Sequence, residues 1–269
     1  MNLYNTQLNK AFQSKSVLKI ITGINNTNIG NVLKIAKAAE LSRATYLDVA
    51  ANVKLVKILK SSCSLPICTS SINPIDLYNC VLAGADLVEI GNYDFFYNQG
   101  IYLTAEQIVN LVLEVKSMVE SIDICVTIPY HITWIEQVYL AQKLEAIGVS
   151  IIQTEGISRF YKAELVSSII DISSLIDTSI PSLLSTYSLS QFVNIPTIAS
   201  SGFKNILAPI AYSYGASGIG FGSSLQQQND VNSIIKYINQ AHKLINSLTN
   251  LEVVYNVSNS YSKLNKVKS

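Results

Sequence analysis

The stretch GASGIGFGSSL, residues 215–225, joins the end of a predicted helix to the start of a short apolar strand. Gly215 suits a helix end, because glycine readily adopts the left-handed backbone angles at which many helices stop. The same arrangement recurs in GAD at 84–86 and GVS at 148–150, each followed by a short run that is rich in apolar residues. A helix that stops at glycine and leads into a buried strand, repeated along a chain, is typical of folds in which helices and strands alternate.

Short apolar runs of this kind occur eight times, and segments with helical periodicity, such as 29–41 and 53–62, separate them. The runs predict strands over residues 17–23, 45–50, 65–71, 86–92, 124–130, 150–156, 196–202 and 218–224. Strands that are apolar throughout and alternate with helices indicate a parallel sheet that those helices cover. Eight strand–helix units predict an α/β protein with a single (β/α)₈ barrel, the TIM-barrel architecture.

The ends of this pattern predict the domain boundaries. Residues 1–248 are expected to form one barrel domain, and its first residues are expected to form a helix that closes the barrel bottom. Residues 249–269 are rich in Asn, Ser and Lys and predict a polar C-terminal tail. Residues 157–195 are more than one connection between strands requires, so Pro181 is expected to divide them into two helices. The first of these helices is either a lid over the barrel or an inserted helix that only packs against it.

The composition bounds the size of the core and excludes several classes of partner. Of the 269 residues, 49% are hydrophobic and 14% are charged, so the chain can bury a large core. A net charge of +1 provides no electrostatic field for nucleic acid. Mean hydropathy is +0.30, yet no apolar run approaches the roughly 18 residues of a membrane span. We therefore expect neither nucleic-acid binding nor a membrane span, and we attribute the hydropathy to buried strands.

The cysteines and histidines do not have the spacing of a metal site. Four cysteines occur without a matched second pair, and there are two histidines, so no dedicated metal site is predicted. Free buried thiols indicate a reducing compartment. Residues 1–16 lack the apolar segment of a secretory signal and contain no arginine, so neither a secretory signal nor an import peptide is expected.

Five polar residues interrupt the predicted strands, where an unpaired charge would be costly. They are Lys19, Asp48, Glu89, Gln153 and Glu155. Side chains alternate along a strand, so these residues are expected to face the barrel interior near the carboxyl ends of the strands, where such barrels carry their active sites. Lys19 is then a candidate base or Schiff-base nucleophile, with Glu89 as its acid/base partner, and Glu155 and Gln153 complete the catalytic set by orienting the substrate.

A structural alternative exists for each of these residues. Buried ion pairs also fix strand register without taking part in chemistry, and Asp48 either joins the catalytic set or simply pairs with Lys19. His131 follows the fifth strand and is either catalytic or a cap or surface residue. Asn92 and Asp94 lie in an aromatic loop after the fourth strand, which either walls a pocket, with Asn92 as a substrate-binding residue, or only packs on itself.

The glycines of the opening stretch also predict a ligand group. Loops after the seventh and eighth strands form the usual phosphate site of this fold, and glycine lets backbone N–H groups approach a phosphate closely. The candidate phosphate-binding residues are Ser201, Gly202, Gly220, Gly222 and Ser223. Alternatively, the glycines only relieve crowding where the barrel closes.

Several motifs resemble one known family. EIGNYDFFYNQG (89–100), QTEG (153–156) and GIGFGSSL (218–225) are similar to segments of an uncharacterised TIM-barrel family of cyanobacteria and red-algal plastids. That family is the hypothetical chloroplast reading frame twenty-three, a domain of unknown function. The resemblance extends over about residues 15–248. It implies a soluble protein that is encoded in a plastid and located in the chloroplast stroma, and it implies no particular activity.

The region of the seventh and eighth strands is more distantly similar to thiazole synthase and to flavin-mononucleotide (FMN) barrels. This similarity implies a phosphate-binding role for Ser201, Gly202, Gly222 and Ser223. Together these expectations favour a lyase or isomerase that binds a phosphorylated small molecule, with its cofactor unknown. The alternatives are an FMN-dependent oxidoreductase and a non-enzymatic binding or regulatory barrel. A homo-oligomer is a further expectation.

Overall fold

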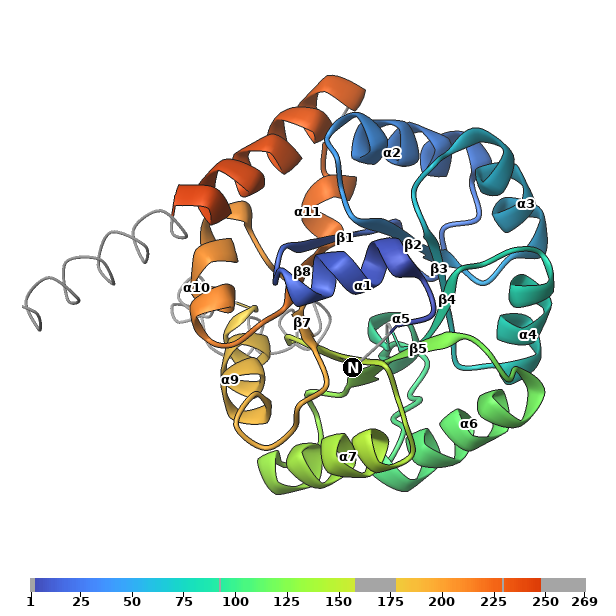
Figure 1. Ribbon diagram of the computed structural model, residues 1–269, viewed down its shortest axis with the longest axis vertical. Helices are drawn as coiled ribbons and strands as arrows, with labels where there is room; N and C mark the ends of the chain where they lie inside the picture. The colour runs from blue at the N-terminus through green and yellow to red at the C-terminus, as the bar shows by residue number, and fades with distance from the viewer. Residues whose placement is uncertain (1–2, 92, 158–177, 229, 248–269) are drawn as a thin grey trace, which may run out of the picture.

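The eight predicted strands form one closed barrel in the computed structural model, which describes residues 3–91, 93–157, 178–228 and 230–247. The strands follow one another around the barrel in chain order, and parallel pairing of β1 with β8 closes it. Their bounds are β1 Val17–Ile21, β2 Tyr46–Ala50, β3 Ile67–Ser71, β4 Leu87–Ile90, β5 Asp123–Ile128, β6 Ile151–Thr154, β7 Thr197–Ala199 and β8 Gly218–Phe221. The (β/α)₈ fold that the sequence predicts is therefore confirmed (Figure 1).

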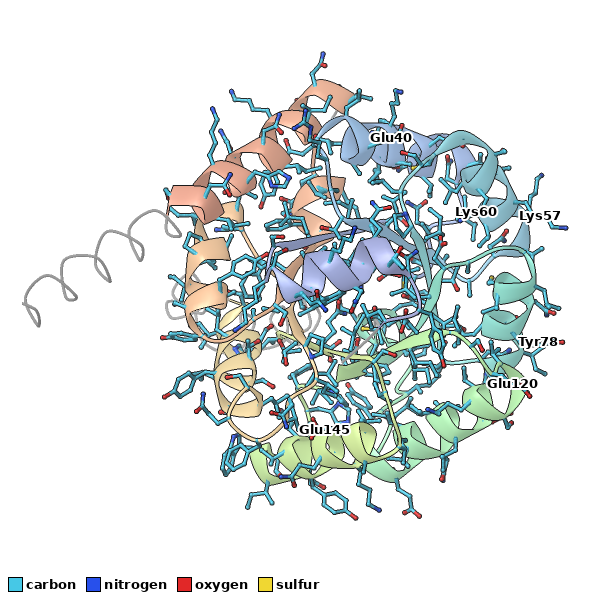
Figure 2. All side chains as sticks on the ribbon, in the orientation of Figure 1. Glu40, Lys57, Lys60, Tyr78, Glu120 and Glu145 are labelled. Atoms are coloured by element: carbon cyan, nitrogen blue, oxygen red, sulfur yellow. The ribbon has the colours of Figure 1, made fainter. Side chains whose placement is uncertain are left out.

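Helices form a ring around the strands (Figure 1). They are α2 Ile29–Leu41, α3 Val53–Ser62, α4 Pro74–Leu82, α6 Ala105–Met118, α7 Trp134–Ala146, α9 Ile180–Leu189, α10 Ala208–Ser213 and a helical segment over 231–247. Their inner faces pack on outward-pointing strand residues such as Leu47 and Val88. Their outer faces carry charged residues such as Lys57, which points away from the barrel (Figure 2).

The helix ends follow the sequence signals that predicted them. Thr104 and Gln107 form a capping box at the start of α6, with reciprocal side-chain-to-backbone hydrogen bonds of 3.2 and 2.8 Å. Gly84, Gly148 and Gly215 follow α4, α7 and α10 with φ values of +105°, +77° and +94°. A β-carbon disfavours these angles, so glycine suits each of these helix-to-strand turns.

The barrel interior is layered along its axis. At the amino ends of the strands, apolar side chains pack against α1 Thr6–Gln13, which lies across the barrel and buries Leu8 and Phe12 (Figure 1). A layer of buried polar side chains that includes Lys19 comes next. The carboxyl ends of the strands then surround a pocket.

Two short helices lie in connections for which the sequence predicts no helix. α5 Asp94–Tyr97 follows β4, and α11 Ser223–Gln226 follows β8. Four residues make little more than one turn, which is too short for a helical repeat to appear in the sequence. A 3₁₀ turn, η1 Asn205–Leu207, similarly precedes α10. Because α5 and α11 follow the carboxyl ends of strands, both contribute residues to the pocket.

Pro181 is the second residue of α9, a position where its missing N–H group is tolerated. The helix expected before it, with the choice between a lid and a packing helix, lies outside the described residues, as does the predicted tail at 249–269. Among the helices that the structure describes, none combines the length and the apolar character needed to cross a bilayer.

Candidate functional site

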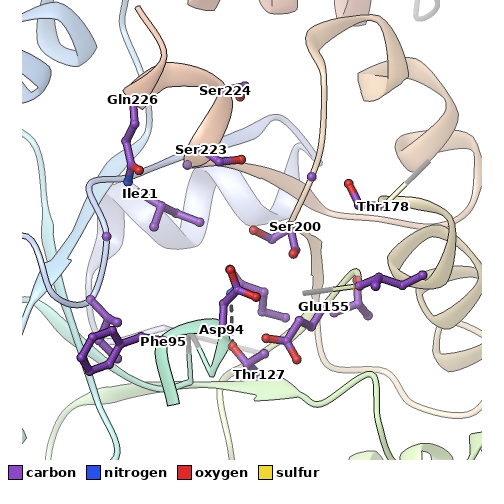
Figure 3. Close-up of a pocket in the computed structure, with 18 of the residues that line it drawn as sticks. Ile21, Asp94, Phe95, Thr127, Glu155, Thr178, Ser200, Ser223, Ser224 and Gln226 are labelled. Carbon is purple, nitrogen blue, oxygen red and sulfur yellow. Dashed lines mark hydrogen bonds between the residues drawn. The ribbon is translucent and has the colours of Figure 1, made fainter. Parts of the chain in front are cut away.

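A pocket of about 730 Å³ opens at the carboxyl ends of the barrel strands. Its walls come from β1, β5 and β6 and from the segments that follow β1, β4, β6, β7 and β8. Asp94, Thr127 and Glu155 lie on one side of the pocket, and Ser200 and Ser223 lie on the other (Figure 3). Carboxyl and hydroxyl groups therefore face one cavity, at the end of the barrel where the sequence predicts the site.

Lys19 lies beneath this pocket in the layer of buried polar side chains. Its Nζ is 2.8 Å from Asp48 Oδ2, donates to Gln153 Oε1 at 2.7 Å and contacts Glu89 Oε2. Gln153 Nε2 in turn donates to Glu89 Oε1 at 2.9 Å. All four side chains are at most 2% exposed. The barrel thus brings together four residues that side-chain alternation predicts to face inward.

Hydrogen bonds connect this layer to the pocket floor. Thr127 donates to Glu89 Oε1 at 2.9 Å, and Gln153 Nε2 donates to Thr127 Oγ1 at 3.1 Å. Thr127 and Gln153 line the pocket, whereas Lys19, Asp48 and Glu89 do not. A molecule in the pocket would therefore meet the amide and the hydroxyl group, with the ion pairs one layer below.

The two carboxylates keep Lys19 as an ammonium ion. Burial alone would favour the neutral amine, but Asp48 and Glu89 outweigh it and hold the pKa of Lys19 well above its ordinary value. A Schiff-base nucleophile needs the opposite, a neutral amine that reaches its substrate. The contacts of Lys19 therefore fit a buried ion-pair layer, the structural alternative that the sequence left open, better than they fit a nucleophile.

Asp48, Cys68 and Glu89 carry ligand atoms within 4.8 Å of one another, a spacing that a metal ion could bridge. Lys19 Nζ already contacts both carboxylates, and Ser70 donates a hydrogen bond to Asp48 Oδ1. Burial raises the pKa of the Cys68 thiol well above its ordinary value, so the thiol lacks the negative charge of a metal-binding thiolate. The lysine therefore suits this donor set better than a metal ion does.

Glu155 places a carboxyl group in the pocket that keeps its proton at neutral pH. It lines the pocket directly after β6, yet it is only 6% exposed. Its Oε2 lies 2.6 Å from Tyr97 OH and 3.3 Å from the backbone nitrogen of Tyr130. Burial raises the pKa of Glu155 to about 8, and the neighbouring Asp94 carboxylate acts in the same direction. A carboxyl group with such a pKa can donate or accept a proton near neutral pH.

His131 lies behind Glu155 and not in the pocket wall. Its Nδ1 is 3.3 Å from Tyr97 OH, and its Nε2 is 3.2 Å from the carbonyl oxygen of Leu103. Burial lowers the pKa of the half-buried His131 ring below its ordinary value, so the neutral ring predominates at pH 7. One hydroxyl group, that of Tyr97, separates this predicted catalytic residue from Glu155.

The loops after β7 and β8 bring most of the predicted phosphate-binding residues to the pocket. Of the five predicted residues, four line the pocket: Ser201, Gly202, Gly222 and Ser223. Gly202 has a φ of +73°, and Ser201, with a φ of +70°, shares this left-handed conformation. The exposed Lys204 follows them at the pocket wall and adds a positive charge.

Of two further predicted binding residues, one does not line the pocket and the other is outside the part of the chain that the structure describes. Gly220 lies within β8 and does not line the pocket. A β-carbon at Gly220 would come within 2.6 Å of Ser200 Oγ and 3.0 Å of Ile21 Cδ1. Crowding inside the barrel, the alternative explanation from the sequence, therefore accounts for this glycine. Asn92, the predicted substrate-binding residue, lies outside the described residues.

Three residues of the site were not named as individual candidates, although Asp94 and Tyr97 lie in the loop that the sequence predicts as a possible pocket wall. Lys204 and Asp94 line the pocket, and Tyr97 contacts Glu155. The available signal was their position shortly after the ends of predicted strands, because such segments carry the functional residues of this fold. The path of each segment depends on tertiary contacts, so the sequence alone did not separate these residues from their neighbours.

Comparison with solved structures shows the same fold. The (S)-3-O-geranylgeranylglyceryl phosphate synthase from Thermoplasma acidophilum is similar with a TM-score of 0.58 and 12% identity, over 92% of this chain and 98% of that chain. A truncated 3-deoxy-D-arabino-heptulosonate 7-phosphate synthase from Thermotoga maritima is similar with a TM-score of 0.61 and 15% identity, over 86% of this chain and 87% of that chain. At these identities the likeness establishes the barrel fold alone.

Relatives at higher identity establish the family. An uncharacterised protein, ycf23, from Antithamnion sp. is 48% identical over 244 residues, which cover 89% of this chain and 88% of the relative. The ycf23 protein from Porphyra purpurea is 36% identical over 259 residues, 96% of each chain. These relatives come from plastid-bearing organisms, in agreement with the plastid origin that the sequence motifs imply. The model of a family described as "Protein of unknown function (DUF561)" matches residues 3–251. The chain therefore belongs to the DUF561 family, together with the ycf23 proteins that its motifs resemble.

Proposed function

We propose that this protein binds a phosphorylated small molecule in the pocket and transforms it by acid–base chemistry of the lyase or isomerase type. The observation that carries the proposal is the division of the pocket into two sides. Ser223 and Ser224 lie across the cavity from Asp94 and Glu155 (Figure 3). One side offers hydrogen-bond donors for an oxyanion, and the other offers a carboxyl group that exchanges a proton near neutral pH.

The donor side suits a phosphate group. Ser224 lines the pocket, and its Oγ is buried without a hydrogen-bond partner within the described part of the chain. A buried hydroxyl group without a partner is uncommon in proteins, and a ligand oxygen would satisfy it. Lys204 adds a positive charge, and Gly202 and Gly222 leave the backbone without β-carbons at the pocket wall.

In this proposal Lys19 is a fixed cation under the pocket floor and does not form a covalent bond with substrate. It holds Gln153 through a 2.7 Å hydrogen bond, and Gln153 and Thr127 present the floor to the bound molecule. Glu155 is the catalytic acid or base, because it combines pocket exposure with a raised pKa of about 8. His131 is a positioning residue that acts on Glu155 through Tyr97.

The names of structural neighbours support a phosphorylated substrate. The Thermoplasma acidophilum synthase was solved with its substrate sn-glycerol-1-phosphate, and the Thermotoga maritima protein is a 7-phosphate synthase. A further neighbour with a TM-score of 0.56 is an aldolase. Because this fold serves many reactions, these names support the class of ligand and of chemistry, and they do not assign a substrate.

Native mass spectrometry of the gently purified protein tests the ligand class. A retained phosphorylated metabolite is the expected result, and its mass would define the substrate class. A retained FMN would instead favour the flavin-dependent oxidoreductase. A bound metabolite that the protein does not turn over would favour the non-enzymatic binding or regulatory barrel.

The phosphate side can be tested with inorganic phosphate as the probe. Phosphate that binds the folded state raises the midpoint of thermal unfolding, and we expect Lys204→Ala to remove most of that increase. Lys57→Ala is the matched control, because Lys57 is exposed on α3 and does not line the pocket. An equal phosphate-induced increase in wild type and Lys204→Ala would contradict the assigned phosphate side.

Two further expectations remain proposals. We place the protein in the chloroplast stroma, as an extension of its plastid origin, and fluorescence microscopy of the tagged protein tests this. We also expect a homo-oligomer, which light scattering of the purified chain would detect as a mass above the 29.4 kDa of the monomer.

A further inference from the structure

A chain of hydrogen bonds leads from the pocket into the protein behind it. Glu155 Oε2 is 2.6 Å from Tyr97 OH, and Tyr97 OH is 3.3 Å from His131 Nδ1. On the far side of the ring, His131 Nε2 is 3.2 Å from the carbonyl oxygen of Leu103. Glu155 lines the pocket, whereas Tyr97 and His131 do not.

The Leu103 carbonyl group sets the direction of this chain. A carbonyl oxygen only accepts hydrogen bonds, so His131 Nε2 carries a proton. A neutral imidazole has one N–H group, so Nδ1 is left as an acceptor and the Tyr97 hydroxyl group donates to it. When Glu155 is ionised, the Tyr97 hydroxyl group donates to its Oε2 at 2.6 Å. When Glu155 carries its proton, the Tyr97 oxygen can accept that proton, and all three donors then point away from the pocket.

We propose that Glu155, Tyr97 and His131 form a proton relay. Through it Glu155 changes between acid and base, while the summed charge of the three side chains stays the same. The Glu155 O–H bond breaks as its proton bonds to the Tyr97 oxygen, and the original Tyr97 O–H bond breaks as that proton bonds to His131 Nδ1. The result is a Glu155 carboxylate, a neutral Tyr97 and a His131 imidazolium. The reverse movement restores the first state, and nothing is oxidised or reduced. The relay rests on the proposed function in that Glu155 acts on the bound molecule.

Aromatic rings hold the relay in place. The Tyr97 ring meets the His131 ring edge to face, with centroids 5.5 Å apart. Tyr102 stacks on Tyr97 at 5.0 Å, and Tyr130 meets Tyr97 edge to face at 5.4 Å. In such apolar surroundings a hydrogen bond is electrostatically stronger than in water. The packing thus keeps three proton-bearing groups in line.

The surrounding charges favour the neutral state of the relay at rest. Burial raises the pKa of Glu155 to about 8, and the carboxylates of Asp94 and Glu89 add to this effect. Burial lowers the pKa of His131, while the carboxylate of Glu136 acts in the opposite direction. At pH 7 Glu155 therefore holds the proton and His131 is neutral, and Glu136 offsets part of the charge when His131 becomes an imidazolium.

Histidine ¹⁵N nuclear magnetic resonance of the protein without ligand tests the relay. The chain has two histidines, and a His131→Gln spectrum identifies the His131 signals. We expect neutral His131 in wild type to carry its proton on Nε2. The Nδ1 signal of His131 should also shift as Glu155 loses its proton near pH 8, because the Tyr97 hydroxyl group then turns from Nδ1 toward the carboxylate, and Glu155→Gln should abolish this shift.

Tyr97→Phe separates a relay from an electrostatic effect through space, because it keeps the ring and removes the hydroxyl group. In Tyr97→Phe, the shift of the His131 Nδ1 signal near pH 8 should be less than about a third of the wild-type shift. Tyr102→Phe is the matched control and should leave the full shift. The Tyr102 ring also packs on Tyr97 and His131, but its hydroxyl group is outside the chain.

Either of two results would overturn the relay. One is a neutral His131 protonated on Nδ1 in wild type, a measurement that requires no variant to fold. The other is a shift of the same size with and without the Tyr97 hydroxyl group. Neither measurement involves phosphate or turnover. The relay can therefore fail while the Lys204 test succeeds, and the Lys204 test can fail while the relay stands.

Discussion

Lys19 neutralises two buried carboxylates, so its replacement reports what the polar layer contributes to stability. Lys19→Met leaves Asp48 and Glu89 buried without the cation that now contacts both. Removing one partner of a buried ion pair strongly destabilises a protein, and we expect the free energy of unfolding to fall by about 3–5 kcal/mol. Urea denaturation of the variant and of wild type measures this difference.

Lys57→Met on the exposed face of α3 is the control for Lys19→Met, and it should change stability by less than about 0.5 kcal/mol. Adding Asp48→Asn and Glu89→Gln to Lys19→Met should restore part of the lost stability, because no unpaired buried charge then remains. A Lys19→Met protein as stable as wild type would show that this ion-pair layer makes no net contribution.

The raised pKa of Glu155 predicts a specific dependence of stability on pH. A carboxyl group whose pKa is higher in the folded state stabilises that state fully at pH values below its unfolded pKa, near 4.5, and this contribution is lost as pH rises to about 8. The free energy of unfolding of wild type should therefore fall, relative to Glu155→Gln, between pH 5 and pH 8. Urea denaturation across that range measures the slope.

Glu114→Gln is the control for the pH experiment, because Glu114 lies on the exposed face of α6. Its profile should run parallel to that of wild type. If the wild-type and Glu155→Gln profiles are also parallel from pH 5 to pH 8, Glu155 does not hold its proton in the folded state, and the acid assigned to the pocket loses its basis.

The loops after β7 and β8 use glycine for different reasons, and alanine substitution distinguishes them. Gly202 has a φ of +73°, and a β-carbon there would come within 2.3 Å of Thr178 Oγ1. A β-carbon at Gly222 would meet nothing closer than Ile21 Cβ at 3.4 Å, which is near ordinary contact. We therefore expect Gly202→Ala to lower the midpoint of thermal unfolding and Gly222→Ala to leave it nearly unchanged.

Gly222→Ala should nevertheless weaken phosphate binding, by about tenfold or 1.4 kcal/mol, if the backbone after β8 approaches the phosphate closely. Titration of inorganic phosphate by calorimetry measures this effect. Unchanged affinity in Gly222→Ala would mean that the phosphate approaches through side chains such as Ser223, and that the glycine has no part in binding.

Helix and strand positions could be predicted because neighbouring residues determine them. α2 and α3 begin and end at the predicted residues, since their apolar periodicity is uninterrupted and an asparagine caps each start. Gly84 and Gly148 mark helix ends through their own backbone angles. α5 and α11 were missed, because four residues contain no repeat that a sequence could display.

The site was predictable only in part, because the height of each side chain along the barrel axis and the path of each loop depend on the closed barrel. Alternation correctly placed Lys19, Glu89 and Gln153 on the interior face. It did not show that Lys19 and Glu89 lie below the pocket and Gln153 at its floor, because the stagger of strands around a barrel sets these heights. Tyr97 entered the site through α5, a helix that the sequence did not reveal.

The barrel as a whole separates an apolar base from the pocket along its axis. The amino ends of the strands and α1 form an apolar layer that includes Leu8 and Phe12. The carboxyl ends carry the pocket with Glu155 and Ser223. The polar layer around Lys19 lies between them. Barrels of this type place function at the carboxyl end and leave the opposite end to stability.

This separation predicts that a cavity at the base destabilises the fold but spares the pocket. Leu8 is fully buried where α1 crosses the barrel, and Leu8→Ala should lower the free energy of unfolding by about 2–5 kcal/mol. Lys10→Ala, on the exposed side of α1, is the control and should have little effect. In urea denaturation Leu8→Ala should lose stability, while calorimetry at a temperature where it remains folded should give the wild-type affinity for inorganic phosphate. Loss of phosphate binding by the folded Leu8→Ala protein would show that the two ends of the barrel are coupled and that α1 helps to shape the pocket.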